Sequence, residues 1–272
     1  MKEHLVKIID TKNSREKNKN LVREYLQKYI LYILYRKKIY KELVFTGGTC
    51  LRFLYGLKRF SEDLDFYLSL ESKENMMDGY DFKNIISIVG RELKDTNYDV
   101  DIKNNIKNNV QNAFFRFKEI PFFYGLSDIK NEKLSIKLEV DSKPPSGGLE
   151  LSDMINLEFL FYLKYYDLGS LFSGKLHAVL YKKYEKGRDF YDMVWYLTRT
   201  DKIEPNYRML ESAIFKTEGI KLKVDNNKWK ELLRDKIKKV DFVDITKDVK
   251  PFLENPEEAE LMTKNNILKL LK

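Results

Sequence analysis

The chain has 272 residues, of which 43% are hydrophobic and 34% are charged, so a disordered chain is excluded and a soluble protein with a sizeable core is expected. A single cysteine excludes a disulfide framework and a cysteine-rich zinc site. The N-terminus lacks the apolar core of a signal peptide, and the longest apolar run, Tyr29 to Tyr35, is too short to span a bilayer. We therefore expect a cytoplasmic protein without a membrane anchor.

The positive charge is concentrated near the N-terminus. The formal net charge is +8, and residues 1–41 contain twelve Lys/Arg and four Asp/Glu, so the remaining chain sums to zero. A basic segment of this kind is suited to contact a nucleic acid backbone. The same charges also suit an ordinary solvated, lysine-rich helix surface, and this alternative stays open.

The first half of the chain reads as alternating helices and strands. Apolar residues recur at helical spacing or alternate with polar ones, and glycines mark the turns. The expected elements, in chain order, are helix 20–38, strand 43–46, helix 49–55, strand 63–70, helix 78–93, and strands 98–103, 112–118 and 134–141.

A Pro/Gly/Ser cluster at residues 142–148 (SKPPSGG) predicts a domain boundary. Beyond it the pattern is helical almost throughout. The expected helices cover residues 152–163, 171–186, 188–199, 206–218, 227–238 and 257–271. The sequence thus predicts an α+β fold, with an α/β domain over residues 1–148 that starts with a basic helix, and an all-α domain over residues 149–272.

An acidic pair follows a glycine turn. Asp63 and Asp65 are two residues apart on a predicted strand, so both carboxylates project from one face and can attract a divalent cation. Upstream, Gly47 and Gly48 allow backbone N–H groups to approach a phosphate. The acids alone would also suit a solvated surface strand. The combination indicates an enzyme that handles a metal-bound nucleotide.

Two-metal phosphoryl transfer needs a further carboxylate from a neighbouring strand. The strand over residues 134–141 offers Glu139 and, two residues on, Asp141. We choose Glu139 because it lies mid-strand, where a rigid element positions it, and keep Asp141 as the alternative. Either could bind metal or accept the proton of an attacking hydroxyl.

A second cluster of charged residues lies in the C-terminal half. Lys175 opens a predicted helix and could neutralise a triphosphate, and Arg188 could pair with a phosphate or a carboxylate. Asp189 and Asp192 are i, i+3 neighbours on one helix face. The alternative is an ordinary helix start, where Asp189 favours the N-terminal turn. Ser61 lies beside the first acids, where phosphorylation would add negative charge.

Three segments carry a resemblance to a known family. They read FTGGTCLRFLYGLKRFSEDLDF, IKLEVD and KLHAVLYKKYEKGRDFYDMVWYL, with a weaker match at VDFVDITKDVKPFL, and together they extend from about residue 43 to 253. The chain resembles the AbiEii/AbiGii family of nucleotidyltransferase-like toxins, which belongs to the DNA polymerase β-like superfamily. The resemblance implies a nucleotidyltransferase-type mixed β-sheet core flanked by helices, followed by a helical domain.

The resemblance also implies roles for individual residues. The phosphates would be faced by Gly47, Gly48 and Thr49, and metal would be held by Asp63 and Asp65. Further catalytic positions of the family would be matched by Lys175 and Asp189, and the nucleotide-binding motif would be completed by Arg188 and Asp192. The position that phosphorylation silences in some relatives would be Ser61. Cys50 stands where many relatives have a small aliphatic residue.

The expected function is that of a toxin from a toxin–antitoxin or abortive-infection system. It would transfer NMP from an NTP to RNA, with the 3′ end of tRNA as the favoured acceptor, using Mg²⁺ or Mn²⁺, which places it in the EC 2.7.7 class. A cognate antitoxin is the implied protein partner. Two alternatives remain, namely transfer to a protein side chain and a non-catalytic nucleotide-binding module, because the fold alone does not fix the acceptor.

Overall fold

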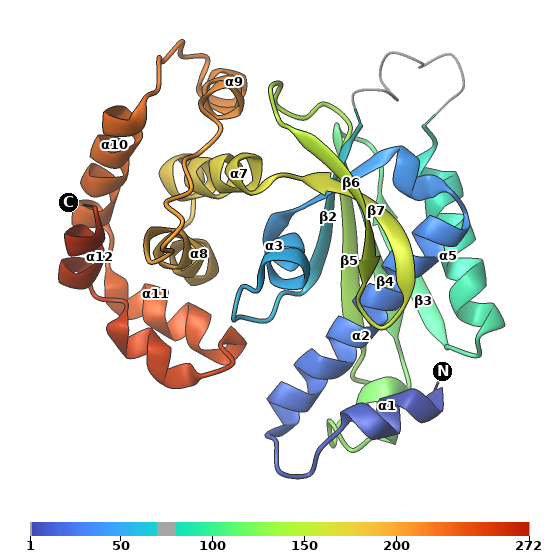
Figure 1. Cartoon of the computed structure of the whole chain (residues 1–272). Coiled ribbons are helices and arrows are strands. Elements are labelled where there is room, and N and C mark those ends of the chain that lie inside the picture. Colours follow the sequence, from blue (N-terminus) through green and yellow to red (C-terminus); the bar gives the residue numbers. More distant parts are fainter. Residues whose placement is uncertain (1, 70–79, 272) are drawn as a thin grey trace. The chain divides into compact units, whose positions relative to one another are not determined.

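The computed structural model describes residues 2–69 and 80–271 (Figure 1). Within this part, seven strands form one mixed sheet in the order β3-β4-β5-β2-β1-β7-β6. The strands are β1 (Leu43–Thr46), β2 (Asp63–Leu68), β3 (Val100–Asn105), β4 (Val110–Phe117), β5 (Leu134–Asp141), β6 (Glu150–Asn156) and β7 (Leu160–Tyr166). At the centre, β2 runs antiparallel to β1 and parallel to β5.

Helices cover the apolar face of this sheet. The elements of the first half are α1 (Lys2–Ile8), α2 (Arg15–Arg36), the short 3₁₀ helix η1 (Ile39–Lys41), α3 (Gly47–Tyr55), α5 (Phe82–Asp95) and α6 (Ile120–Phe123). Helix α2 packs on β5 and α5, and α5 packs on β3 and β4 (Figure 1). The core therefore forms between these helices and the buried alternate residues of the strands.

The second half is helical. Its elements are α7 (Leu168–Tyr181), α8 (Gly187–Leu197), α9 (Tyr207–Glu218), α10 (Asn226–Lys239), α11 (Phe242–Val249), the 3₁₀ helices η3 (Lys250–Phe252) and η4 (Pro256–Leu261), and α12 (Lys264–Leu270). Helix α7 packs against α8, α9 and α10, and α8 packs against α11. Most of these helices start at a side-chain cap, as where Asn206 accepts a 3.1 Å hydrogen bond from the Met209 N–H.

The chain divides into two compact units that interleave along the sequence. The first unit comprises Met1–Cys50, Phe60–Pro144 and Glu150–Tyr165, and the second comprises Leu51–Arg59, Pro145–Leu149 and Tyr166–Lys272. The sheet belongs to the first unit and helices α7 to α12 to the second. The domain boundary at residues 148/149 stays a prediction, with residues 150–165 grouped with the sheet.

The helix predicted over residues 152–163 is wrong, because this segment forms β6 and β7 with a turn at Glu158, whose φ is +115°. Along β7 the inward positions, Phe161 and Leu163, are buried, but the outward Leu160 and Tyr162 are apolar too. The alternation that marks a strand is therefore hidden in a continuous apolar run.

Two further differences concern the C-terminal half. The helix predicted over residues 257–271 is interrupted, and Thr263 caps its second part by accepting a 3.2 Å hydrogen bond from the Asn266 N–H. The sequence reading also omitted α11. The other predicted elements are confirmed to within a few residues, except that the ends at residues 70, 78 and 79 lie outside the described residues. No described helix is both long enough and apolar enough to cross a membrane.

Candidate active site

The register between β2 and β5 places the predicted acids on one face of the sheet. Asp65 is the direct neighbour of Glu139, and Asp63 is the direct neighbour of Lys137. All four side chains are partly exposed, whereas the residues between them are buried against the core. Paired residues on adjacent strands share a face, so the three predicted carboxylates form a contiguous acidic surface with Lys137 among them. Asp141, the alternative to Glu139, lies one step further along the same face.

Lys137 is a further member of this surface, and the sequence analysis does not name it among the site residues. Its Nζ donates to Glu139 Oε2. Partial burial favours the neutral amine, but the carboxylates of Glu139, Asp63 and Asp65 outweigh it, so the pKa of Lys137 lies above its usual value. Lys137 is therefore a fixed cation amid an excess of negative charge.

The negative charge of this face also acts on neighbouring groups. Burial raises the pKa of the Tyr67 hydroxyl, and the charges of Asp141, Asp65 and Glu139 raise it further. Burial also raises the pKa of the Cys50 thiol, again with a contribution from Asp65. Both groups stay neutral near pH 7, so they add no negative charge to this face.

The glycine turn is built around Asp65. Gly47 has a φ of +78°, and a Cβ at this position would overlap the Asp65 carboxylate and come within 2.9 Å of its Cγ. Only glycine combines this backbone conformation with so close an approach. Gly48 and Thr49 follow in the first turn of α3, and both are buried. The predicted Gly-Gly-Thr turn thus lies directly against one of the predicted metal-binding acids.

Thr49 connects the glycine turn to the backbone of Asp63. Its hydroxyl donates to the backbone carbonyl of Asp63, and its side chain is fully buried. The segment before Asp63 is held from the other direction by α2, where the buried Gln27 amide donates a 3.0 Å hydrogen bond to the Ser61 carbonyl. Backbone contacts on two sides therefore fix where β2 begins. The phosphate-facing role of Thr49 and the regulatory role of Ser61 stay predictions.

The second predicted cluster forms a buried network of charges within the helical unit. Lys175 on α7 lies 3.2 Å from Asp189 Oδ1 and 2.8 Å from Asp192 Oδ2, and Lys182 lies 2.8 Å from Asp189 Oδ2. Asp192 also receives two hydrogen bonds from Arg59, from Nε at 2.6 Å and Nη2 at 2.7 Å. The structure therefore brings Lys175, Asp189 and Asp192 together and adds Arg59, while the predicted role of Lys175 toward a triphosphate stays a prediction.

Because these charged side chains are buried, each needs an opposite charge close to it. Arg59 is 2% exposed and Asp192 is 0% exposed. Burial alone would raise the pKa of Asp189, but the ammonium groups of Lys175 and Lys182 outweigh it and hold that pKa well below its ordinary value. The Asp189 carboxylate therefore stays ionised beside the cations that neutralise it.

The Arg188 side chain contacts an aromatic ring of the same unit. Its guanidinium lies 4.1 Å from the centre of the Phe252 ring, a cation–π contact. The preceding Gly187 starts α8 where the chain passes α11, since a Cβ there would overlap the carbonyl of Ile245. Its N–H donates a 2.7 Å hydrogen bond to Asp248. The predicted roles of Arg188 and Asp192 in nucleotide binding remain predictions.

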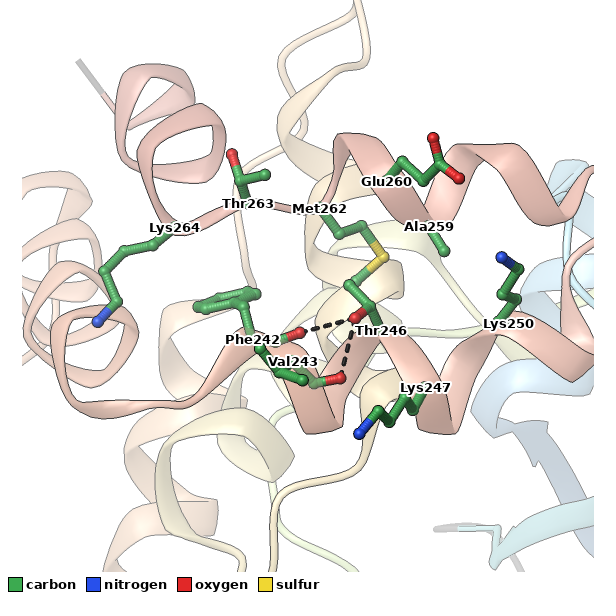
Figure 2. A pocket seen from close by; sticks show the side chains of 10 residues that line it. All are labelled: Phe242, Val243, Thr246, Lys247, Lys250, Ala259, Glu260, Met262, Thr263 and Lys264. Atoms are coloured by element: carbon green, nitrogen blue, oxygen red, sulfur yellow. Dashed lines mark hydrogen bonds between the residues drawn. The ribbon is translucent and has the colours of Figure 1, made fainter.

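A pocket of about 400 Å³ lies elsewhere in the helical unit, between α11, η4 and α12 (Figure 2). Apolar side chains such as Phe242 and Met262 line it, with Lys247, Lys250 and Lys264 around it. The Thr246 hydroxyl is hydrogen-bonded to backbone carbonyls one turn back in α11. None of the site residues predicted from the sequence lines this pocket, so it is separate from both charged clusters.

Comparisons with known proteins identify the fold and the family. The family model for the nucleotidyl transferase AbiEii toxin of type IV toxin–antitoxin systems matches residues 29–264. The chain belongs to the AbiEii family. This match covers both charged clusters, and it assigns the AbiEii chain to the nucleotidyltransferases and to the toxins of toxin–antitoxin systems.

Solved structures agree with this family at the level of the fold. A candidate nucleotidyltransferase from H. pylori has a TM-score of 0.54 and 18% sequence identity, and the match covers 92% of each chain. JHP933 from Helicobacter pylori has the same TM-score and 17% identity, with 93% of the AbiEii chain and 90% of JHP933 covered. Curated protein sequences give no match.

Sequence reasoning missed Arg59 as a member of the site. Its signal was weak, because Arg59 stands next to Lys58 between the apolar Leu57 and Phe60, both of which are buried, and the sequence does not tell which of the two cations is buried. A charged residue in such a setting needs a buried partner, but the partner, Asp192, is 133 residues away and no local spacing identifies it.

We predict that Gly47→Ala inactivates AbiEii-type nucleotidyl transfer, because the new methyl group displaces Asp65. Incorporation of labelled nucleotide by the purified variant measures this, and we expect a loss on the order of 100-fold. Gly56→Ala is the matched control, since Gly56 has a φ of +77° but open space around it. It should lower stability by about 1 kcal/mol and keep activity. An active Gly47→Ala variant would contradict this account of the turn.

We predict that Arg59→Met and Asp192→Leu each destabilise the protein by about 3 to 5 kcal/mol, because each removes the bidentate partner of a buried charge. The double variant should lose less than the sum of the two. Urea denaturation measures these changes. The exposed Arg199–Asp201 pair provides the control: Asp201→Ala should cost less than about 1 kcal/mol. Additive losses in the double variant would show that the buried pair is uncoupled.

We predict that Asp189→Asn is less stable than the wild type at pH 7 and that the difference shrinks below about pH 4. The folded-state pKa of Asp189 lies below its unfolded value of about 3.9, so the carboxylate stabilises the fold above that pH and loses this effect as it protonates. Denaturant unfolding from pH 7 to pH 3 measures the difference. A difference independent of pH would refute the assignment.

Proposed function

We propose that this AbiEii chain transfers a nucleoside monophosphate from an NTP to the 3′ end of an RNA, with tRNA as the favoured acceptor. The observation that carries the proposal is the shared face of Asp63, Asp65 and Glu139, with Gly47 against Asp65. Acids at this position suit the metal-dependent displacement of pyrophosphate by a hydroxyl. The site would act in the cytoplasm, where NTPs and RNA meet, and a cognate antitoxin would oppose it.

The donor chemistry of this face suits Mg²⁺. Within the described residues, no three Asp, Glu, His or Cys side chains converge as a preformed metal cage. Such a cage is not what Mg²⁺ requires, because this ion keeps several waters and is usually bound by one or two carboxylates together with substrate phosphates. Asp63 and Asp65, with Glu139, would hold Mg²⁺ or Mn²⁺, which would offset the charge that develops on the phosphate.

The other residues have roles that follow from their places. The backbone at Gly47 and Gly48, at the start of α3, would bind phosphate oxygens. Glu139 would accept the proton of the attacking hydroxyl if it is not occupied by metal. For Lys175 and Asp189, the support for a catalytic role is the family motif together with their mutual ion pair.

An RNA acceptor is favoured over a protein side chain by the basic N-terminal segment. Part of its charge is neutralised inside the first unit, since Arg15, Lys19 and Arg23 pair with Asp128, Glu132 and Glu62. The remaining net charge still attracts polyanions. Incubation with labelled NTP in the presence of total RNA and total protein separates the two acceptors, and we expect the label on RNA.

We predict that Asp63→Ala and Glu139→Gln each lower NMP incorporation into RNA by about 100-fold or more, because metal binding contributes several kcal/mol to such a transition state. Chelation of divalent ions should have the same effect on the wild type. Asp201→Asn is the control: Asp201 is exposed and pairs with Arg199 at 2.6 Å, and it belongs to neither charged cluster. Retained incorporation by Asp63→Ala, with the fold intact by circular dichroism, would refute the proposal.

A further inference from the structure

Strand β4 continues the polar face of the site away from the glycine turn. Asn112 is the direct neighbour of Glu139, and Phe114 is the direct neighbour of Lys137. Both therefore project from the same face as Asp63 and Asp65. The intervening Ala113 and the following Phe115 point to the other face and are fully buried. An aromatic ring and an amide thus lie in line with the acidic surface, one strand beyond Glu139.

Neither side chain has a hydrogen-bonding or aromatic partner in the described part of the chain. In residues 2–69 and 80–271, the Asn112 amide makes no hydrogen bond and the Phe114 ring makes no contact with another aromatic ring. Both are partly exposed, unlike Phe115 and Phe117 on the same strand, which are at most 1% exposed. A partly exposed aromatic among polar strand residues is the usual platform for a nucleobase on a β-sheet.

The proposed reaction predicts from which side of the site the acceptor hydroxyl approaches. Gly47 lies after β1 on one side of β2, and Glu139 and then Asn112 lie on the other side. In phosphoryl transfer the attacking oxygen and the leaving group are roughly in line on opposite sides of the phosphorus. If the leaving pyrophosphate lies over the glycine turn, the attacking hydroxyl comes from the side of β5 and β4.

The charge around the platform suits a polynucleotide. On β3, Lys103 is the direct neighbour of Phe114 and is exposed, and Arg116 lies one step along β4. Lys133 precedes β5 and shares Asp101 with Arg116. Cations beside a stacking ring bind the phosphates of a strand whose base lies on that ring. A protein substrate would need no such ring.

We propose that β4 binds the terminal nucleoside of the acceptor, with its base stacked on Phe114 and its ribose or base edge hydrogen-bonded to the Asn112 amide. The proposal rests on the proposed function and specifies its acceptor as a polynucleotide with an intact terminal base. It assigns Phe114 and Asn112 to acceptor recognition and leaves the NTP to the side of the glycine turn.

The test compares Phe114→Ala with the wild type on two acceptors, a short RNA and the same RNA with an abasic 3′-terminal nucleotide. For the intact RNA, we expect the acceptor KM of Phe114→Ala to rise about tenfold, while the KM for NTP stays within about twofold. The wild type should lose about the same factor on the abasic RNA, and Phe114→Ala should show no further loss. Phe114→Trp should restore the wild-type KM. Phe122→Ala, which removes a half-exposed ring on α6, is the control and should change neither KM.

Each result of this test either supports or overturns the inference. A Phe114→Ala variant that raises the KM for NTP alone would show that the donor base stacks there, and one that changes neither KM would remove the platform. Equal losses of wild type and variant on the abasic RNA would also overturn the inference. If the wild type labels no RNA, the proposed function itself fails, which is a result distinct from any effect of Phe114.

Discussion

The parallel pairing of β2 with β5 is the constraint on which the site depends. Side chains alternate along both strands, so a slip of one residue would turn Leu64 and Phe66 outward and bury Asp63 and Asp65. Burial of the apolar set in the core opposes such a slip by the free energy of removing those side chains from water. The hydrophobic core therefore determines which acids are neighbours, although no core residue takes part in the chemistry.

A different balance holds the helical unit together. Buried charges are costly, and Arg59, Lys175, Asp189 and Asp192 are stable only because each faces an opposite charge at hydrogen-bonding distance. A network of this kind tolerates little change, since loss of one member removes a partner from a buried charge. It also fixes side-chain orientations more strictly than apolar packing would.

The sequence predicted the central strands and the acid pair because both depend on local information. Alternation over β5 and the D-x-D spacing can be read within a few residues, and so can the glycine turn. Pairings between distant segments cannot be read in this way. The neighbours Asp65 and Glu139 are 74 positions apart, and Arg59 and Asp192 are 133 apart. The edge hairpin β6–β7 was misread because its outward residues are apolar, which removes the polar half of the strand pattern.

The composition of the acidic face bears on whether the chain is a catalyst or a binding module. Asp63, Asp65, Glu139 and Asp141 repel one another, and Lys137 compensates only part of that repulsion. A fold selected for stability alone would gain by replacing one of these acids with a neutral residue. Natural proteins keep such locally unfavourable groupings where function requires them. The excess negative charge of this face therefore fits a functional site better than a purely structural one.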